Sequence, residues 1–365
     1  MKSKQTPIEK PIRAFDFFSG CGGTSAGLRD AGMEIVFALD VDPDAAATFK
    51  TNFPEATFYR RDVTRLRADS ITKLVEEDRT RPILFCGCAP CQPFSQQNGS
   101  RKKKDTRIPL LTHFGRFVKY HKPDFVLVEN VPGLQKITDE AGPLPRFLKL
   151  LKRMKYTVRM DTIDCCDYGV PQKRKRFVLL ASRLGGLELP QKSHGPGRAN
   201  PTYSTVGEWI LGLPEIAAGE SSLAVKNHRA ASLSDKNLER IRATPVGGGR
   251  LDWPANLRLK CHQDHDGHSD VYGRLRADLP ASALTTRCIS LSNGRFGHPT
   301  QARAISVREA ALLQTFDRDF EFSGSLNSMA RQIGNAVPVL LARRLGETFI
   351  SNAKEHLAGG ADGNL

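Results

Sequence analysis

The first apolar run of the chain and the turn after it read Ala14-Phe15-Asp16-Phe17-Phe18-Ser19-Gly20-Cys21-Gly22-Gly23. The apolar run predicts a short buried strand, and glycines placed after a strand can adopt positive φ and let backbone approach a ligand closely. A nicotinamide-type dinucleotide turn would need a third glycine, but Ser25 stands at that position. The stretch therefore predicts a strand followed by a ligand-binding turn of another kind.

Short apolar strands alternate with helical patterns from this stretch to residue 185. We expect strands at residues 14–18, 35–39, 56–59, 83–86, 125–129 and 177–181, and helices at residues 24–31, 43–53 and 144–155. This alternation predicts an α/β fold with a doubly wound, mostly parallel sheet. In such folds ligands bind at the carboxyl ends of the strands.

The composition changes after residue 185. Prolines and glycines cluster in residues 190–201, and residues 186–300 lack the strand-helix rhythm, whereas helical spacing returns at residues 307–316 and 337–350. We expect a first, cofactor-binding domain over residues 1–185 and a second, smaller domain over residues 186–300. Residues 301–356 are expected to return to the first domain, and residues 357–365 to form a disordered tail.

The chain is strongly basic. Its 365 residues carry 54 Lys and Arg against 39 Asp and Glu, a formal charge of +15. Such an excess favours a polyanionic partner, most often nucleic acid, although an ordinary basic protein has the same composition. The polar, lysine-rich start predicts no secretory signal, and no apolar run reaches the roughly 20 residues of a membrane span. We expect the eight cysteines to be thiols in a reducing cytoplasm.

A cysteine-containing segment follows the fourth expected strand and reads Gly87-Cys88-Ala89-Pro90-Cys91-Gln92-Pro93-Phe94-Ser95. A cysteine just past a strand end, with basic residues after it, is well placed to act as a nucleophile. Three further motifs follow in the order Glu129-Asn130-Val131, Gln172-Lys173-Arg174-Lys175-Arg176 and Gly334-Asn335-Ala336-Val337-Pro338. Together with the glycine-rich stretch, these segments resemble the DNA (cytosine-5) methyltransferases of the prokaryotic type, over roughly residues 13–350.

The resemblance implies a Rossmann-like sheet that binds S-adenosylmethionine and releases S-adenosylhomocysteine. Asp40 is then expected at the ribose, although most of the family carries the longer glutamate there, with Val41 against the adenine ring and Asp62 at its amino group. The full set of cofactor-binding residues that it implies is Phe18, Ser19, Gly20, Cys21, Gly22, Gly23, Asp40, Val41, Asp62, Val63, Pro90, Leu110, Asn335 and Ala336.

The resemblance also implies the catalytic residues. Cys91 would add as a thiolate to carbon 6 of cytosine, which turns carbon 5 into a nucleophile for the methyl group. Glu129 would bind ring nitrogen 3 and the exocyclic amine, and Arg176 the carbonyl oxygen of the base, while Arg174 supports the site. Loss of the carbon 5 proton and of the thiol would release 5-methylcytosine.

Duplex DNA hides the faces of its bases, so the target cytosine must be flipped out. The loop after the nucleophile is expected to close over DNA and contact it through Ser95, Arg101, Lys102, Lys103, Lys104 and Arg107. Residues 186–300 stand where the family has its target-recognition domain. Base or phosphate contacts there could come from Arg229, Arg240, Arg250, Arg258, Arg274, Arg276, Arg287 and Arg295.

Each motif alone has a simpler interpretation: a buried cysteine is usually inert, and a Glu-Asn pair after a strand is often a turn. A redox pair of Cys88 and Cys91 lacks a thioredoxin context, and these cysteines lack a fourth zinc ligand. A second zinc site is not favoured either, and its residues would be Cys261, His262, His265 and His268. We therefore expect no metal.

We interpret the chain as a DNA (cytosine-5) methyltransferase, either solitary or paired in function, not physically, with a restriction endonuclease. It is expected to act as a monomer on double-stranded DNA in the bacterial cytoplasm at the nucleoid, and not on membranes. One alternative is a tRNA cytosine-5 methyltransferase, but the Cys-Phe-Thr tripeptide common in that branch is absent. The other is a catalytically silent DNA-binding relative, against which Cys91, Glu129 and Arg176 argue.

Overall fold

A computed structural model describes residues 11–89, 110–133, 142–259 and 270–361 of the chain. The chain forms two compact units. The first consists of Met1–Ile163, Lys175–Gln191 and Leu341–Leu365, and the second of Asp164–Arg174 and Lys192–Leu340. The return to the first unit therefore begins at residue 341, later than residue 301 where the sequence led us to expect it.

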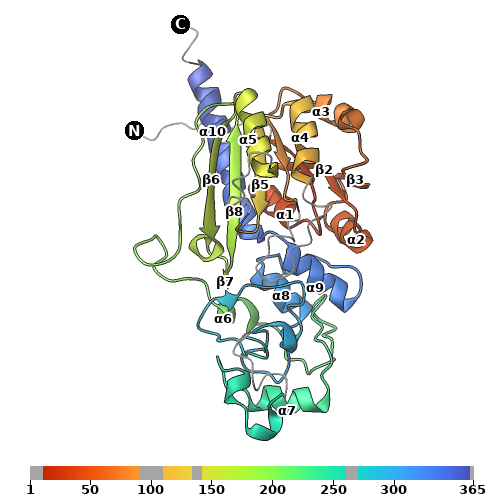
Figure 1. Ribbon diagram of the computed structural model, residues 1–365, viewed down its shortest axis with the longest axis vertical. Helices are drawn as coiled ribbons and strands as arrows, with labels where there is room; N and C mark the ends of the chain where they lie inside the picture. Colours follow the sequence, from red (N-terminus) through yellow and green to blue (C-terminus); the bar gives the residue numbers. More distant parts are fainter. Residues whose placement is uncertain (1–10, 90–109, 134–141, 260–269, 362–365) are drawn as a thin grey trace. The chain divides into compact units, whose positions relative to one another are not determined.

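The first unit is built on a seven-stranded sheet with the strand order β3-β2-β1-β4-β5-β8-β6 (Figure 1). Its strands are β1 Arg13–Phe17, β2 Glu34–Asp40, β3 Thr57–Arg60, β4 Ile83–Cys86, β5 Phe125–Asn130, β6 Thr157–Asp164 and β8 Lys175–Ser182. Strands β1 to β5 pair in parallel, and β8 is antiparallel to β5. The mostly parallel, doubly wound sheet is confirmed. Strand β6 was not expected, because most of its residues are polar and not buried.

The strand order has a reversal point between β1 and β4. The chain runs from β1 outwards to β2 and β3, and then returns to place β4 on the other side of β1. Ligands of doubly wound folds bind in the crevice at the carboxyl ends of the two strands at such a point. The turn after β1 and the segment after β4 therefore lie where a ligand is expected.

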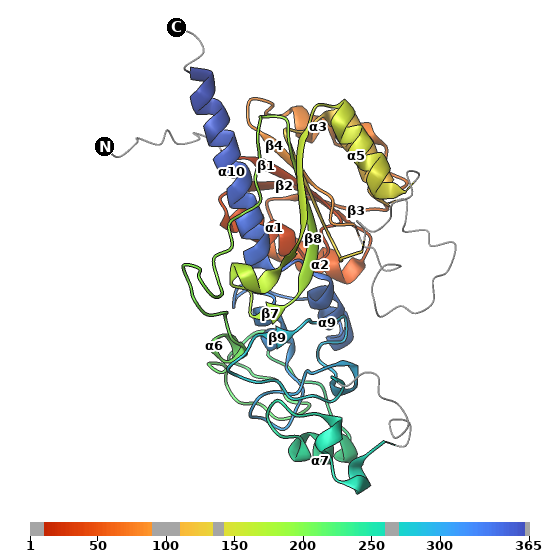
Figure 2. The same cartoon turned by 60° about the vertical axis from the view of Figure 1, so that its left-hand side comes forward.

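Helices cover both faces of this sheet (Figures 1 and 2). They are α1 Gly23–Asp30, α2 Pro43–Asn52, α3 Thr72–Glu76, α4 Leu110–His121, α5 Pro143–Arg153 and α10 Val339–Ala361. On one face Phe114 and Phe117 of α4 pack on Phe17, at ring-centroid distances of 5.4 and 4.9 Å. On the other face Phe349 of α10 packs on Phe125 at 5.1 Å. Helix α10 continues to Ala361, so residues 357–361 are helical and not disordered.

The second unit contains little sheet. Its strands β7 Gln172–Lys173 and β9 Ala281–Ser282 pair in parallel, and its α-helices are α6 Val206–Ile210, α7 Asp235–Ala243, α8 Val307–Leu313 and α9 Leu326–Asn335. Buried arginines help to hold its loops: Arg303 makes two 2.7 Å contacts with the Glu309 carboxylate. No helix among the described residues of either unit has the length and apolar character that would let it cross a membrane.

Candidate active site

The backbone at the end of β1 is strained. Phe18 has a φ of 96°, and a residue held in such a sparsely populated region costs about 1–3 kcal/mol. The backbone amides of Phe18 and Ser19 both donate to the Leu39 carbonyl of β2, at 2.9 and 3.1 Å, and so hold this conformation. Strain of this kind collects at functional sites. The turn is therefore the first part of the candidate site.

Two glycines of the turn adopt conformations that other residues would resist. Gly20 has a φ of +53°, and its amide donates to Asp40 Oδ2 at 2.8 Å. Gly22 has a φ of +101°, and a Cβ there would lie 2.7 Å from the Phe53 ring. The positive φ expected from the sequence is thus confirmed at this turn, and the close contact at Gly22 is with the Phe53 ring.

Asp40 ends β2 with both carboxylate oxygens engaged by backbone. Oδ2 accepts from Gly20, and Oδ1 accepts from the Asp42 amide at 2.9 Å. Burial raises the pKa of Asp40 above its ordinary value, although the hydrogen bonds from these two backbone amides lower it in part. Each carboxylate oxygen has two lone pairs, so Asp40 can still accept from ligand hydroxyls. Asp42 is the N-cap of α2, where it accepts from Asp44 and Ala45.

Two further side chains favour a ligand at this turn. Ser19 is buried, and its Oγ has no hydrogen-bond partner among the described residues. Val41 follows Asp40 and is 61% exposed, although its side chain is apolar. A ligand with a polar group at Ser19, hydroxyls at Asp40 and an apolar ring on Val41 would satisfy all three. The polar amino-acid part, ribose and adenine of S-adenosylmethionine fit this set of groups.

Asp62 lies at the neighbouring strand end. It follows β3, and its Oδ1 accepts from the Thr64 amide at 2.8 Å, a bond that lowers the pKa of Asp62. Val63 is buried in the aromatic core, and Leu110 at the start of α4 packs partly buried on the same core. Val63 and Leu110 of the expected cofactor set therefore belong to one hydrophobic core, and Asp62 directly precedes Val63 in the chain.

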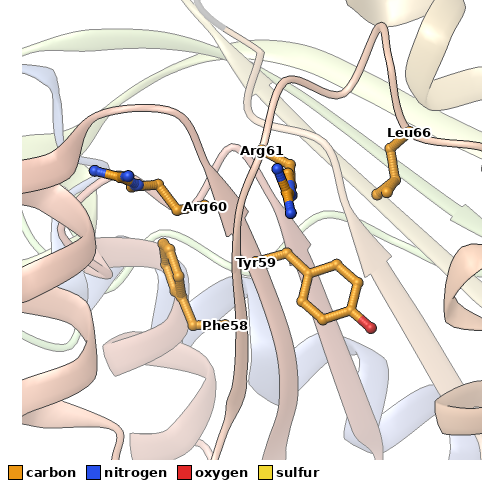
Figure 3. A pocket seen from close by; sticks show the side chains of 5 residues that line it. All are labelled: Phe58, Tyr59, Arg60, Arg61 and Leu66. Carbon is orange, nitrogen blue, oxygen red and sulfur yellow. The ribbon is translucent and has the colours of Figure 1, made fainter.

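An open cavity of about 450 Å³ borders β3 directly before Asp62 (Figure 3). Figure 3 shows Phe58 and Arg60 on one side of the strand and Tyr59 on the other, towards Leu66. The residues that line the cavity are Phe58, Tyr59, Arg60, Arg61 and Leu66. The cavity was not expected from the sequence, in which this run reads only as a short strand.

The segment that leads to the expected nucleophile is tied closely to the sheet. The Gly87 amide donates to the Leu127 carbonyl of β5 at 2.8 Å. A Cβ on Gly87 would lie 2.5 Å from the Phe114 ring of α4, so the segment passes directly against this helix. Only glycine fits between the strand and the ring without displacement.

Asn130 at the end of β5 provides a second tie. Its Nδ2 donates to the Ala89 carbonyl at 2.9 Å, and its Oδ1 accepts from the Val131 amide at 2.8 Å. Asn130 is 5% exposed, so these bonds are shielded from water. Pro90 and Cys91 follow Ala89 directly in the chain. No role for Asn130 was expected from the sequence, and the only signal was its place in a Glu-Asn pair at a strand end.

Glu129 and Arg176 form an ion pair across neighbouring antiparallel strands. The Arg176 Nε lies 2.7 Å from Glu129 Oε1, and the two side chains are 13% and 10% exposed. Antiparallel pairing of β5 with β8 sets Glu129 opposite Val178, which brings the start of β8 to the end of β5. The two side chains that were expected to hold different edges of one base therefore lie together, beside Asn130.

Three cysteines that the structure describes near this site, Cys21, Cys86 and Cys88, have raised pKa values. Burial raises the pKa of Cys21 to about 12 and the pKa values of Cys86 and Cys88 well above the ordinary range. The Cys88 Sγ lies 3.6 Å from Thr24 Oγ1, and the charge of Glu129 raises the Cys88 pKa further. Since the thiolate is the reactive form, these three thiols are poor nucleophiles.

Arg174 belongs to the second unit and is 3% exposed. Its guanidinium donates to the Leu284 carbonyl at 2.7 Å and to the Gly334 carbonyl at 2.8 Å, with a longer contact of 3.5 Å to Ala336. Gly334 and Ala336 flank Asn335, which is exposed. The side chain thus holds the backbone around Asn335, which supports a positioning role for Arg174.

Two glutamines complete this network within the second unit. Gln172 Nε2 donates to Gln314 Oε1 at 3.1 Å, and Gln314 Nε2 donates to the Ile333 carbonyl at 2.7 Å. A Cβ on Gly334 would lie 2.2 Å from the Thr285 carbonyl oxygen, so the chains pack in direct contact there. The motif that contains Gln172 and Arg174 and the motif that contains Gly334 are far apart in the sequence, but they are joined by hydrogen bonds within the second unit.

The structure separates the arginines of residues 186–300 into two groups. Arg274 is buried and donates to four backbone carbonyls, and Arg295 holds the carbonyls of Gly247 and Gly248 at 2.7 Å. Arg229 and Arg287, in contrast, are exposed. Arg274 and Arg295 hold loops together, whereas the exposed pair remains available for a nucleic-acid contact.

Several expected site residues lie outside the described residues. They are Pro90, Cys91, Ser95, Arg101, Lys102, Lys103, Lys104 and Arg107, and the zinc candidates Cys261, His262, His265 and His268. Among the residues that the structure describes, no cluster of His, Cys, Asp and Glu side chains could hold a metal ion.

The chain is similar to known DNA methylases over nearly its whole length. The model of the C-5 cytosine-specific DNA methylase family matches residues 12–351. The Type II methylase M.HgiDII of Herpetosiphon aurantiacus is 36% identical over 340 residues, which cover 92% of this chain and 94% of the relative. The Type II methyltransferase M1.HphI of Haemophilus parahaemolyticus is 33% identical over 339 residues, 92% and 86% of the two chains.

A solved structure is similar in fold. It is a prophage-encoded DNA modification methyltransferase of E. coli, with a TM-score of 0.72, 23% identity and coverage of 94% of this chain and 99% of that chain. Because the family motifs span nearly the whole sequence on a matching sheet, the protein belongs to the C-5 cytosine-specific DNA methylases and is a DNA cytosine-5 methyltransferase.

Proposed function

We propose that this enzyme uses Cys91 to methylate carbon 5 of a cytosine that is flipped out of duplex DNA. The observation that carries the proposal is the Glu129–Arg176 ion pair at the end of β5. A carboxyl and a guanidinium held there can bind two edges of a single base. The neighbouring Asn130 donates a hydrogen bond to the carbonyl of Ala89, which lies two residues before Cys91 in the sequence.

The chemistry follows from these groups. The Cys91 thiolate forms a bond to carbon 6, and the displaced electron pair makes carbon 5 nucleophilic. Glu129 at ring nitrogen 3 and Arg176 at the carbonyl oxygen stabilise the charge that develops on the ring. Carbon 5 then takes the methyl group and loses its proton. The bond from carbon 6 to sulfur breaks last, which restores the aromatic ring and the thiolate.

S-adenosylmethionine supplies an electrophilic methyl group when it is bound. Ser19, Asp40, Val41 and Asp62 would hold it, because they offer an unpartnered buried hydroxyl, two carboxylates and an exposed apolar face. The remaining members of the expected cofactor set, including Asn335 and Ala336, are proposed on the resemblance alone.

The second unit is proposed to recognise the target sequence in DNA. Its exposed Arg229 and Arg287 are the candidates for contacts to bases or phosphates. The named relatives are Type II methylases, so we infer that this enzyme is the methylating member of a restriction-modification pair in a bacterial cytoplasm, or a solitary descendant of one.

Covalent trapping tests the nucleophile. Duplex DNA with 5-fluorocytosine cannot lose the substituent at carbon 5, so the wild-type enzyme with S-adenosylmethionine should form a stable adduct at Cys91. Cys91→Ser should form none and transfer no labelled methyl group, whereas Cys88→Ser, a matched control, should still form the adduct. An adduct on the Cys91→Ser protein would refute the assignment.

The substrate is tested separately. Bisulfite sequencing of DNA from a methylation-free host that expresses the enzyme should show methylated cytosines in one sequence context. Labelled methyl transfer to tRNA, with none to duplex DNA, would instead establish the tRNA methyltransferase. Absence of transfer to either, despite tight DNA binding, would establish a silent relative.

A further inference from the structure

Helices α4 and α5 are adjacent in the first unit and contain no acidic residue. They carry six Lys and Arg, namely Arg116 and Lys119 of α4, and Arg146, Lys149, Lys152 and Arg153 of α5. Helix α10 of the same unit differs, because both Arg343 and Arg344 pair with Glu347 at 2.9 Å. The two neighbouring helices therefore contribute only cations, and no carboxylates, to their surface.

The cations of α5 share one face of the helix. Arg146, Lys149, Lys152 and Arg153 are exposed, whereas Leu144, Phe147 and Leu151 of the opposite face are buried in the core. Residues spaced three, four or seven positions apart lie on the same side of an α-helix. The outer face of α5 is thus basic along about 10 Å, from Arg146 to Arg153 at 1.5 Å per residue.

The face is rigid because α4 and α5 pack closely. Gly115 of α4 lets α5 approach: a Cβ there would lie 3.3 Å from Leu150 Cδ2. The rings of Phe114 and Phe147 pack at a centroid distance of 5.8 Å. Since these apolar side chains are used within the protein, α5 has no apolar face left for a lipid surface.

Helix stability explains only part of this pattern. Lys152 and Arg153 lie in the last turn, where cations interact favourably with the helix dipole. Arg146 lies at the start of the helix, where the dipole disfavours a cation. For Arg146, Lys152 and Arg153 the structure shows no ion pair among the residues that it describes. Arg146 in particular is better explained by an external anion.

We propose that this α4–α5 face binds the phosphate backbone of duplex DNA outside the target site. The inference rests on the proposed DNA substrate. Helix α5 follows β5, and a crossover helix begins at the edge of the sheet where its strand ends. The basic face therefore starts at the edge that carries Glu129 and extends away from it. DNA that flanks the target would add phosphate contacts that no base sequence controls.

Salt dependence gives the test. Each phosphate contact contributes about 0.9 to the slope of log affinity against log salt. The variant R146Q/K152Q/R153Q should therefore lose up to about 2.7 of that slope on a labelled 40-base-pair DNA duplex. Between 50 and 200 mM salt, wild-type affinity should then fall about 40-fold more than variant affinity.

A control variant distinguishes the effect of the α4–α5 face from the effect of net charge on DNA affinity. R343Q/R344Q/K354Q removes three charges from α10, and its slope should match that of the wild type. Equal loss of slope in both variants, or none in the α5 variant, would overturn the proposal, as would an effect on duplex RNA but not on DNA. Retained thermal unfolding temperatures would show that both variants fold.

Methylation separates this inference from the proposed function. On long DNA the α5 variant should show a raised KM with an unchanged kcat. If the wild-type protein methylates DNA and the α5 variant has the same KM and salt slope, the α4–α5 face does not bind DNA, and the proposed function still stands. A wild-type protein that transfers no methyl group to DNA would refute the proposed function, whatever the slopes are.

Discussion

The Asn130 side chain is the most direct way to test how the sheet positions the nucleophile. Its Nδ2 donates to the Ala89 carbonyl at 2.9 Å, and Ala89 is 5% exposed. Asn130→Asp keeps an oxygen for the Val131 amide but replaces the donor with an acceptor that faces the Ala89 carbonyl. The substitution therefore replaces one buried hydrogen bond with an unfavourable contact between two oxygens, with little change in volume.

The size of the effect follows from that bond. A buried group left without its partner costs about 1–3 kcal/mol. If the whole cost falls on the geometry that the nucleophile needs in the transition state, the rate of methyl transfer drops about 5- to 150-fold. Cofactor affinity should change little, because the hydrogen bonds of Asn130 that the structure describes go to Ala89 and Val131 and not to the residues around Asp40.

Single-turnover transfer of labelled methyl to duplex DNA, at saturating cofactor, measures this rate. Urea unfolding measures the free energy of unfolding, and trapping with 5-fluorocytosine measures adduct formation. Asn130→Asp should slow both methyl transfer and adduct formation. Adduct formation at the wild-type rate, in a protein destabilised by the expected amount, would refute the idea that this bond positions the nucleophile.

Two further predictions concern stability. Burial raises the pKa of Asp16 to about 7, so the native state binds a proton that the unfolded chain releases near pH 4. The free energy of unfolding should therefore fall as pH rises from about 4 to 7, by up to about 4 kcal/mol from this group. Asp16→Asn should remove that dependence in urea unfolding, and an unchanged pH profile would contradict the assignment. Gly87→Ala should cost about 1–3 kcal/mol by overpacking against Phe114. Adding Phe114→Leu should recover part of this in a double-mutant cycle, whereas strictly additive costs would argue against the clash.

The expected strands and helices of the first unit agree with the structure to within a residue or two at most ends. They agree because each is a buried apolar run or has one apolar face, and burial leaves its period in the sequence. Strand β6 was missed because its side chains are largely exposed and polar. The end of α10 was missed because Gly359 and Gly360 disfavour a helix, yet residues 357–361 continue it.

Predictions about the site also differ in whether they depend on residues close together in the chain or on distant ones. The glycine turn, Asp40 and Glu129 could be placed at strand ends, because a strand end and the next turn are neighbours in the chain. Arg174 was grouped with the catalytic residues, but its guanidinium is surrounded by backbone carbonyls of the second unit. The roles of Asn130 and of the cavity beside β3 could not be predicted either.

The sequence by itself determined most strands and helices of the first unit, the glycine turn and the motifs that identify the family, because these depend on residues close together in the chain. Only the tertiary structure decided the partners of Asn130 and Arg174, which bond to residues 41 and 160 positions away. The physical reason is that a hydrogen bond depends on distance in space. A local pattern records which face of a segment is buried, but not which distant backbone atom will lie against it.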